Sequence, residues 1–139
     1  MKLGEAILER DFLEELLERL GLRLQRDSTA GRPVNPTLLE IERSAKRRRD
    51  VQMSIDWTLQ QLTIEGMTLG SYFSRVGQLE DLIDLLENAD SPDVREKVED
   101  LLKAKKETEK LIETVKWAQD LLIPEIRIPE DQPELKEEN

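Results

Sequence analysis

Two clusters of carboxylates have a spacing that could support metal chemistry. The chain reads Glu14-Glu15-x-x-Glu18 and later Glu80-Asp81-x-x-Asp84. Acids spaced in this way on facing helices can hold Mg²⁺, which would activate water to hydrolyse a nucleotide phosphate. The helical phase opposes this chemistry, because four leucines interleaved with the first cluster occupy the inward face and turn the acids toward solvent. We therefore expect a solvated acidic face with no bound metal, no other cofactor and no catalytic residue.

Histidine and cysteine are both absent from the 139 residues. Their absence excludes disulfides, thiol nucleophiles, Ser-His-Asp and Cys-His catalysis and thiolate or histidine zinc sites. The 31 acidic and 21 basic residues give a formal net charge of −10, which repels nucleic acid. The one basic cluster, Lys46-Arg47-Arg48-Arg49, spreads around a helix and fits an acidic partner, including the chain's own acidic tail.

Arg10 is a charged residue at a position where the apolar pattern of its helix expects a hydrophobe. If the first two helices run antiparallel, Arg10 lies opposite Gln52 and within about a turn of Asp56, with Arg48 one turn further along. These four residues could form a buried polar layer that fixes register or oligomeric state. Alternatively, they could surround a small anionic ligand, held bidentately by arginine. We favour the polar layer over ligand binding and over the Mg²⁺-dependent hydrolase.

Four amphipathic segments must position these side chains. Apolar residues recur at alternating steps of three and four, which is typical of one helix face. The expected helices span residues 2–26, 36–63, 68–89 and 92–122. Short motifs recur between the first and third segments and between the second and fourth. Ile55-Asp56-Trp57 matches Val115-Lys116-Trp117 in the latter pair.

The fold class predicted by these patterns is all-α. A duplicated antiparallel hairpin would form a four-helix bundle, or long coiled-coil-like helices that dimerise. Residues 1–122 would form this domain, and residues 123–139 an acidic, proline-containing arm. Trp57 and Trp117 flank the apolar stripes, so each either seals the end of the core or anchors an interface. Ile126 and Ile128 alternate as in an extended strand, and this arm either packs in a groove of its own subunit, adds to a partner or is disordered in isolation. Our prediction for these four residues is an interface.

Three motifs resemble the septicolysin-like family of small bacterial helical proteins over residues 1–122. They are the opening Met1-Lys2-Leu3-x-Glu5-Ala6 with Arg10, the turn Glu65-Gly66-Met67-Thr68-Leu69, and Trp117 near the end of the last helix. The resemblance implies a helical fold; the lysin activity suggested by the name is not carried over.

The chain departs from the family pattern at two places. Ile55-Asp56-Trp57-Thr58 stands where family members have Asn-Arg-Thr-Asn, and Val76-Gly77 where they have Arg-Asp. Any polar site that those residues form in the family is therefore altered or absent here, and Arg10 is the position that survives.

These observations favour a non-enzymatic helical scaffold or adaptor. Long helices with a narrow apolar seam leave little spare apolar area in a monomer, so we expect self-association, with a homodimer first. Further protein partners would bind through helix faces or the C-terminal arm. We expect a cytoplasmic protein with no membrane contact, because no apolar run has the length of a membrane span or follows the pattern of a leader.

Overall fold

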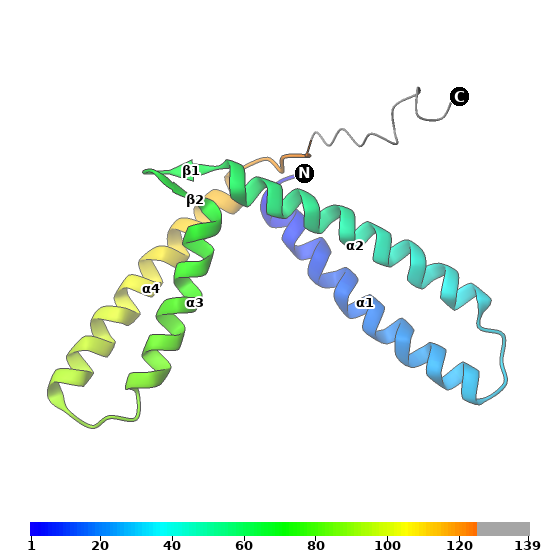
Figure 1. The fold of residues 1–139 in the computed structure, drawn as a ribbon, viewed down its shortest axis with the longest axis horizontal. Helices are drawn as coiled ribbons and strands as arrows, with labels where there is room; N and C mark the ends of the chain where they lie inside the picture. Colours follow the sequence, from blue (N-terminus) through cyan, green and yellow to red (C-terminus); the bar gives the residue numbers. More distant parts are fainter. Residues whose placement is uncertain (125–139) are drawn as a thin grey trace, which may run out of the picture.

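The computed structural model describes residues 1–124 and consists of two antiparallel helical hairpins (Figure 1). The elements in chain order are α1 (Leu3–Thr29), α2 (Asn35–Gln61), β1 (Thr63–Ile64), β2 (Met67–Thr68), α3 (Leu69–Leu86) and α4 (Pro92–Ala118). The predicted all-α fold class is confirmed, with one two-residue antiparallel strand pair between the hairpins in the described part of the chain. The expected arm residues Ile126 and Ile128 lie outside the described residues.

The two hairpins diverge from a shared base, so that the four helices form an open V (Figure 1). α1 packs along α2 and α3 along α4, whereas the hairpins contact each other near the base. A core there joins residues of α1, α2 and α3, namely Leu3, Ala6, Val51, Ile55 and Leu69. The bundle is therefore closed at one end and open at the other.

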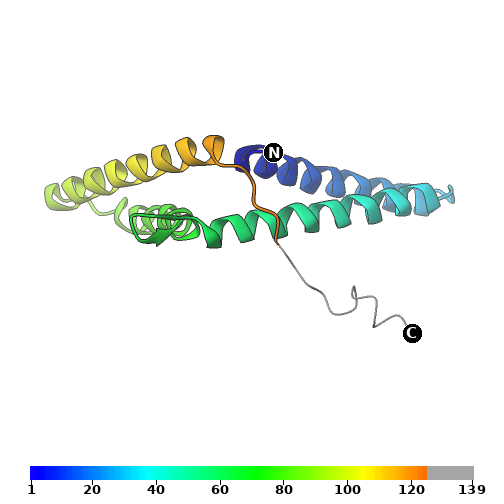
Figure 2. The same cartoon turned by 90° about the horizontal axis from the view of Figure 1, so that it is seen from above.

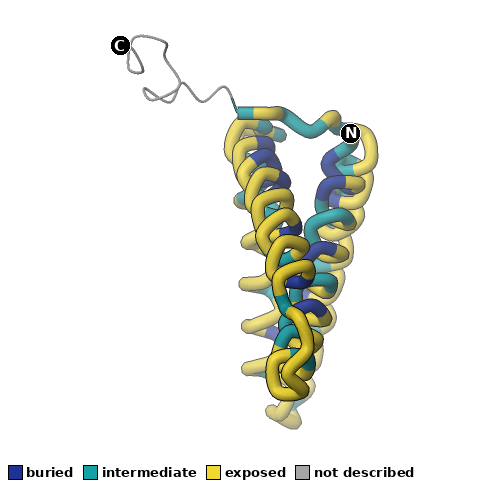
Figure 3. The backbone as a smooth tube through the Cα atoms, turned by 90° about the vertical axis from the view of Figure 1, so that its right-hand side faces the viewer, coloured by how far each residue is buried: buried dark blue, intermediate teal, exposed yellow. Residues whose placement is uncertain are grey.

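Along the arms of the V, each hairpin buries a single seam. Leu13 and Leu20 are buried in the first hairpin, and Ile83, Leu101 and Ile112 in the second. Figure 3 shows that the buried residues line the facing sides of the helices while the outer faces are exposed. A two-helix hairpin has one contact face per helix, so the rest of each helix surface remains in contact with solvent.

The base is closed in the same way on both sides. After α2, the Leu62 carbonyl accepts the Leu69 N–H at 2.8 Å, and Thr63 pairs with Thr68. After α4, the Gln119 carbonyl accepts the Leu3 N–H at 2.9 Å, and Lys2 and Asp120 form an isolated bridge. Each helix that returns to the base is thus tied by backbone hydrogen bonds to the start of the helix that leaves it.

This closure defines the internal repeat. α2 and α4 are both 27 residues long, and their first residues, Asn35 and Pro92, are 57 positions apart. The motif match between Trp57 and Trp117 implies 60 positions instead, so the predicted equivalence of the two tryptophans is wrong. The motif match failed because short sequence runs in amphipathic helices do not report where the helices end.

Several predicted helix ends also differ from the structure. α4 ends at Ala118 and not at residue 122, because Gln119 adopts extended backbone angles (φ −87°, ψ 129°) and Asp120 then pairs with Lys2. α1 continues to Thr29, beyond the predicted end at residue 26. α2 ends at Gln61 and α3 at Leu86, before the predicted ends at residues 63 and 89. The turn between β1 and β2 uses positive φ angles at Glu65 and Gly66, which glycine adopts at no steric cost.

Candidate functional site

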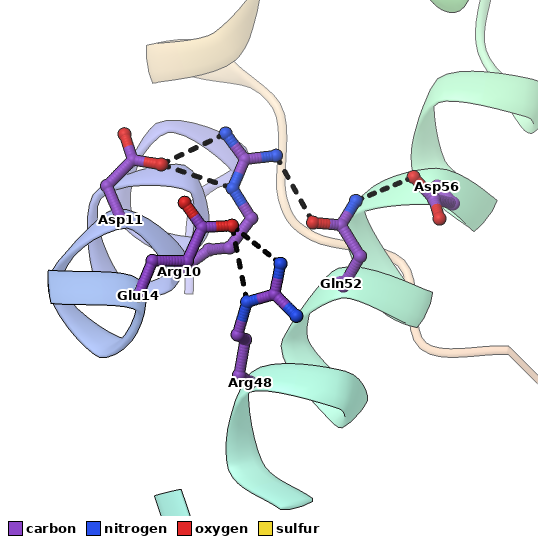
Figure 4. A network of polar contacts seen from close by, with 6 residues as sticks. All are labelled: Arg10, Asp11, Glu14, Arg48, Gln52 and Asp56. Carbon is purple, nitrogen blue, oxygen red and sulfur yellow. Dashed lines mark hydrogen bonds and ion pairs between the residues drawn. The ribbon is translucent and has the colours of Figure 1, made fainter. Parts of the chain in front are cut away.

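A chain of polar contacts joins α1 to α2 about two turns from the base (Figure 4). Arg10 Nη1 donates to Gln52 Oε1 at 3.3 Å, and Gln52 Nε2 donates to Asp56 Oδ1 at 2.8 Å. Antiparallel packing places Arg10 opposite Gln52, as expected from the sequence. Gln52 and Asp56 are one helical turn apart, which is the spacing that lets their side chains meet on one face of α2.

The Arg10 guanidinium is already engaged by a carboxylate of its own helix. Its Nε and Nη2 donate to Asp11 Oδ1 at 3.2 and 3.1 Å. The Arg10 side chain is 27% exposed and Asp56 is exposed, so these residues lie at the edge of the seam. The prediction that this polar layer is buried is therefore wrong. The flank of a two-helix hairpin is open, so long polar side chains reach water there.

Arg48 does not join Arg10 and Gln52. Its Nε and Nη2 donate to Glu14 Oε2 at 3.2 and 2.7 Å, which forms a separate ion pair between α2 and α1. The second hairpin carries a pair at the equivalent positions, between Lys105 Nζ and Glu80 Oε2 at 3.2 Å. The repeat thus preserves a basic residue on the returning helix and an acid on the leaving helix.

A second arginine of the basic cluster makes the best-aligned ion pair between α1 and α2. Arg47 Nε and Nη2 donate to the two oxygens of Glu9 at 2.6 and 2.9 Å. These hydrogen bonds lower the pKa of the Glu9 carboxyl below its ordinary value, against the opposing effect of partial burial. A bidentate arginine–carboxylate contact has a defined geometry as well as a charge interaction, so it orients the two helices.

A groove of about 900 Å³ is lined by residues of α2, β2 and α3. Asp56 and Gln60 contribute to its lining from α2, and Ser74, Arg75 and Gln78 from α3. Arg10 and Arg48 are not among the lining residues. The arginines predicted to clamp an anionic ligand therefore bind acids of the protein itself and do not face this groove.

The acids of the two carboxylate clusters, whose spacing could support a metal site, are dispersed. Glu14 and Glu80 take part in the two ion pairs, and Glu15, Glu18, Asp81 and Asp84 are exposed. Within residues 1–124, no three acidic, histidine or cysteine side chains are grouped so that they could hold a metal ion.

The two tryptophans occupy different surroundings. Trp117 lies against Gly4 of α1, and its indole Nε1 donates to Glu113 Oε2 at 3.1 Å. Lys116 and, to a smaller extent, Trp117 hydrogen-bond Glu113 and lower the pKa of its carboxyl below the ordinary value. Trp57 is partly exposed on α2. Trp117 thus takes part in the junction between the hairpins as well as presenting exposed surface.

A further exposed face of α1 did not emerge from the sequence reasoning. We call it the outer stripe, and it consists of Glu5, Leu8, Phe12, Glu15, Arg19, Leu22 and Arg26, all of which are exposed. Steps of three and four residues place these side chains along one side of the helix, opposite the seam with α2. The apolar members could have been found in the sequence as a second periodic set, out of phase with the stronger set that forms the seam.

Comparisons with known proteins give no relatives: neither a family model, nor a curated protein, nor a solved structure matches the chain. Among residues 1–124, none of the helices combines the length and apolar character needed to cross a membrane.

Proposed function

We propose that this protein is a non-enzymatic helical scaffold that forms a homodimer through the outer stripe of α1. The observation that carries the proposal is the exposure of Leu8, Phe12 and Leu22, at 59%, 55% and 66%, on the face opposite the seam. Large apolar side chains gathered on one exposed face are typical of protein–protein contact surfaces. The resemblance to the septicolysin-like family and a cytoplasmic location remain part of this proposal.

The outer stripe is complementary to a second copy of itself. Glu5 lies near the start of α1 and Glu15 near its middle, whereas the arginines of the stripe, Arg19 and Arg26, lie toward its end. A two-fold axis near the middle of the stripe would make two α1 helices antiparallel, because an isologous interface uses the same patch on both subunits. Glu5 would then face Arg26 of the partner subunit.

The same arrangement pairs the apolar residues of the stripe. Leu8 would lie near the partner subunit's Leu22, and Phe12 near the partner subunit's Arg19, whose planar guanidinium stacks favourably on an aromatic ring. The distance from Leu8 to Leu22 along α1 is about 21 Å at 1.5 Å per residue. Apolar contacts would thus occur near both ends of the stripe, with the Glu5–Arg26 pairs beyond them. The two copies of Glu15 lie near the axis, each within about one turn of the partner subunit's Arg19.

A binding role for Arg10 and Arg48 receives less support. Both guanidinium groups hydrogen-bond acids of the chain at 2.7–3.2 Å. An anionic ligand would have to displace Asp11 or Glu14 from them, and neither arginine lines the groove near α3. Within the described residues, the only charged member of the outer stripe with a side-chain hydrogen bond is Glu5, which accepts the Lys2 N–H at 2.7 Å, and Leu8, Phe12 and Leu22 are exposed, which supports assembly over ligand binding.

The test is the mass of the full chain in solution, measured by light scattering after gel filtration. We expect twice the 16.2 kDa of one chain. Phe12→Lys should raise the dimer dissociation constant at least about tenfold, because it removes an aromatic anchor and places a second cation beside the partner subunit's Arg19. The helical circular-dichroism spectrum should stay unchanged, since Phe12 is exposed in the single chain.

Leu85→Lys is the matched control for this experiment. Leu85 is 78% exposed on α3 and lies outside the outer stripe, so this variant adds the same charge on the other hairpin and should remain dimeric. A monomeric parent chain, or a Phe12→Lys chain as dimeric as the control, would contradict the proposed interface.

A further inference from the structure

We propose that one face of α2 is a docking site for the chain's own C-terminal segment, residues 125–139, bound within the same molecule. The site begins at a groove of about 440 Å³ between α2 and the segment that follows α4. Met53, Leu121 and Ile123 supply apolar lining, and Ile123 is 76% exposed. Pro124, the last described residue, is itself part of this lining, so the remaining chain starts at the groove.

The path of the chain into this groove is fixed by two hydrogen bonds. The Leu121 N–H donates to the Met1 carbonyl at 2.8 Å, and the Leu122 N–H donates to Thr58 Oγ1 at 2.8 Å. Thr58 is fully buried, and its hydroxyl also donates to the Ser54 carbonyl at 2.7 Å. Figure 2 shows the resulting course, in which the segment after α4 leaves its own hairpin and crosses to α2.

Beyond the groove, the same face of α2 continues as a mixed apolar and basic surface. We call it the α2 stripe, and it comprises Leu39, Arg43, Lys46, Asp50 and Met53. Steps of four and three residues align these side chains along one side of the helix. The stripe contains two apolar residues, two basic residues and one acid, Asp50, and all five side chains are exposed. Within residues 1–124, the ion pairs do not involve Arg43 or Lys46.

The charges of the site and of its occupant are complementary. Residues 43–49 contain five basic side chains, of which Arg47 and Arg48 pair with acids of α1. Arg43 and Lys46 are the two bases of the α2 stripe, which also holds Asp50. Residues 125–139 contain six acids and two bases, and their two isoleucines, Ile126 and Ile128, follow directly after the exit from the groove. From the groove outward, the α2 stripe presents first the apolar Met53 and then the basic Lys46 and Arg43. The segment likewise presents its isoleucines first and most of its acids afterwards.

The segment is long enough to reach the whole α2 stripe. Its 15 residues span up to about 50 Å when extended, at roughly 3.3 Å per residue. Leu39 and Met53 are about 21 Å apart along α2, at 1.5 Å per residue. Because the segment is tethered at one end of the site, its effective concentration there favours binding in the same chain over binding to another copy.

This inference is separate from the proposed homodimer, since it concerns a face of α2 and a segment of the same chain. It assigns a ligand class to the α2 stripe, namely an extended acidic peptide with aliphatic residues at one end. An acidic protein partner of this chemistry would compete with the C-terminal segment for the same surface.

The test measures the distance from the segment to α2 in the full chain. Because the chain has no cysteine, Glu40→Cys and Gln132→Cys introduce two unique attachment points for spin labels. Double electron–electron resonance should give a narrow short-distance peak at low ionic strength. Tenfold dilution with unlabelled chain should leave the peak unchanged if docking is intramolecular, whereas loss of the peak would show that segments bind other copies and would overturn the proposal.

Charge reversal tests the chemistry of the site. Arg43→Glu with Lys46→Glu should abolish the short-distance peak, and so should about 0.5 M NaCl on the labelled parent chain, where screening weakens exposed ion pairs. Lys97→Glu with Lys103→Glu makes the same change of charge on exposed positions of α4 and should leave the peak intact. A broad distance distribution in the parent chain, or equal loss in both charge-reversal variants, would overturn the inference.

Discussion

At the scale of single residues, the junction between the hairpins depends on a glycine packed under a tryptophan ring. A Cβ atom at Gly4 would lie 2.7 Å from Trp117 Cε3 and 2.8 Å from Trp117 Cδ2. Both distances are well inside van der Waals contact. Gly4 is therefore required for the close approach of α1 and the last turn of α4.

Gly4→Ala should lower the free energy of unfolding by about 1–3 kcal/mol, because the new methyl group must displace the Trp117 ring. Gly21→Ala is the control in the same helix, since beyond the local helix backbone no atom lies within 4 Å of the position that a methyl group would take there. That substitution should raise stability by about 0.5–1 kcal/mol through helix propensity. Urea unfolding of both variants distinguishes these outcomes, and equal effects would show that Trp117 does not constrain position 4.

Arg10 is the second residue whose role can be measured directly. Arg10→Leu should leave the melting temperature unchanged or slightly raised, because Asp11 is exposed and Gln52 keeps its hydrogen bond to Asp56, so no buried charge loses its partner. Arg23→Leu removes the same charge from an exposed position of α1 and controls for the change in net charge. If Arg10→Leu lowers the free energy of unfolding by more than about 2 kcal/mol and Arg23→Leu does not, the Arg10 guanidinium compensates a buried acid.

At the scale of elements, the antiparallel pairing of α1 and α2 combines an apolar seam with ion pairs along its flank. The Arg47–Glu9 fork is partly screened by solvent, so a contribution of about 0.2–1 kcal/mol is expected from pairs of this kind. The folded-state pKa of Glu9 lies below its ordinary value because Arg47 donates two hydrogen bonds to the carboxylate. The pair therefore stabilises the hairpin at pH values above the ordinary glutamate pKa.

Acid should remove this contribution. As the pH falls past about 4.3, the ordinary value for glutamate, and through the lowered value in the folded chain, the unfolded state binds the proton first. Glu9→Gln should therefore be less stable than the parent chain at pH 7 and equal to it once Glu9 is protonated. Thermal unfolding from pH 7 to pH 3 measures the difference, with Glu42→Gln as an exposed control; a constant difference at all pH values would contradict the ion-pair role.

At the scale of the whole molecule, stability is concentrated at the base of the V. Leu3, Ile55 and Leu69 are fully buried there, and the backbone bonds from Leu3 to Gln119 and from Leu69 to Leu62 close both sides. The arms extend from this base with one buried seam each. Two long surfaces, the outer stripe of α1 and the α2 stripe, remain available on the first hairpin for a second copy and for the C-terminal segment.

The sequence by itself determined the four helices, their pairing into two hairpins and the position of Arg10 opposite Gln52. These features follow from local periodicity and from short connections, which make consecutive helices antiparallel neighbours. Only the tertiary structure decided that Arg48 pairs with Glu14, that α4 ends at Ala118 and that the hairpins diverge. Those features depend on contacts between residues more than 30 positions apart, where side-chain packing and backbone pairing compete with helix propensity.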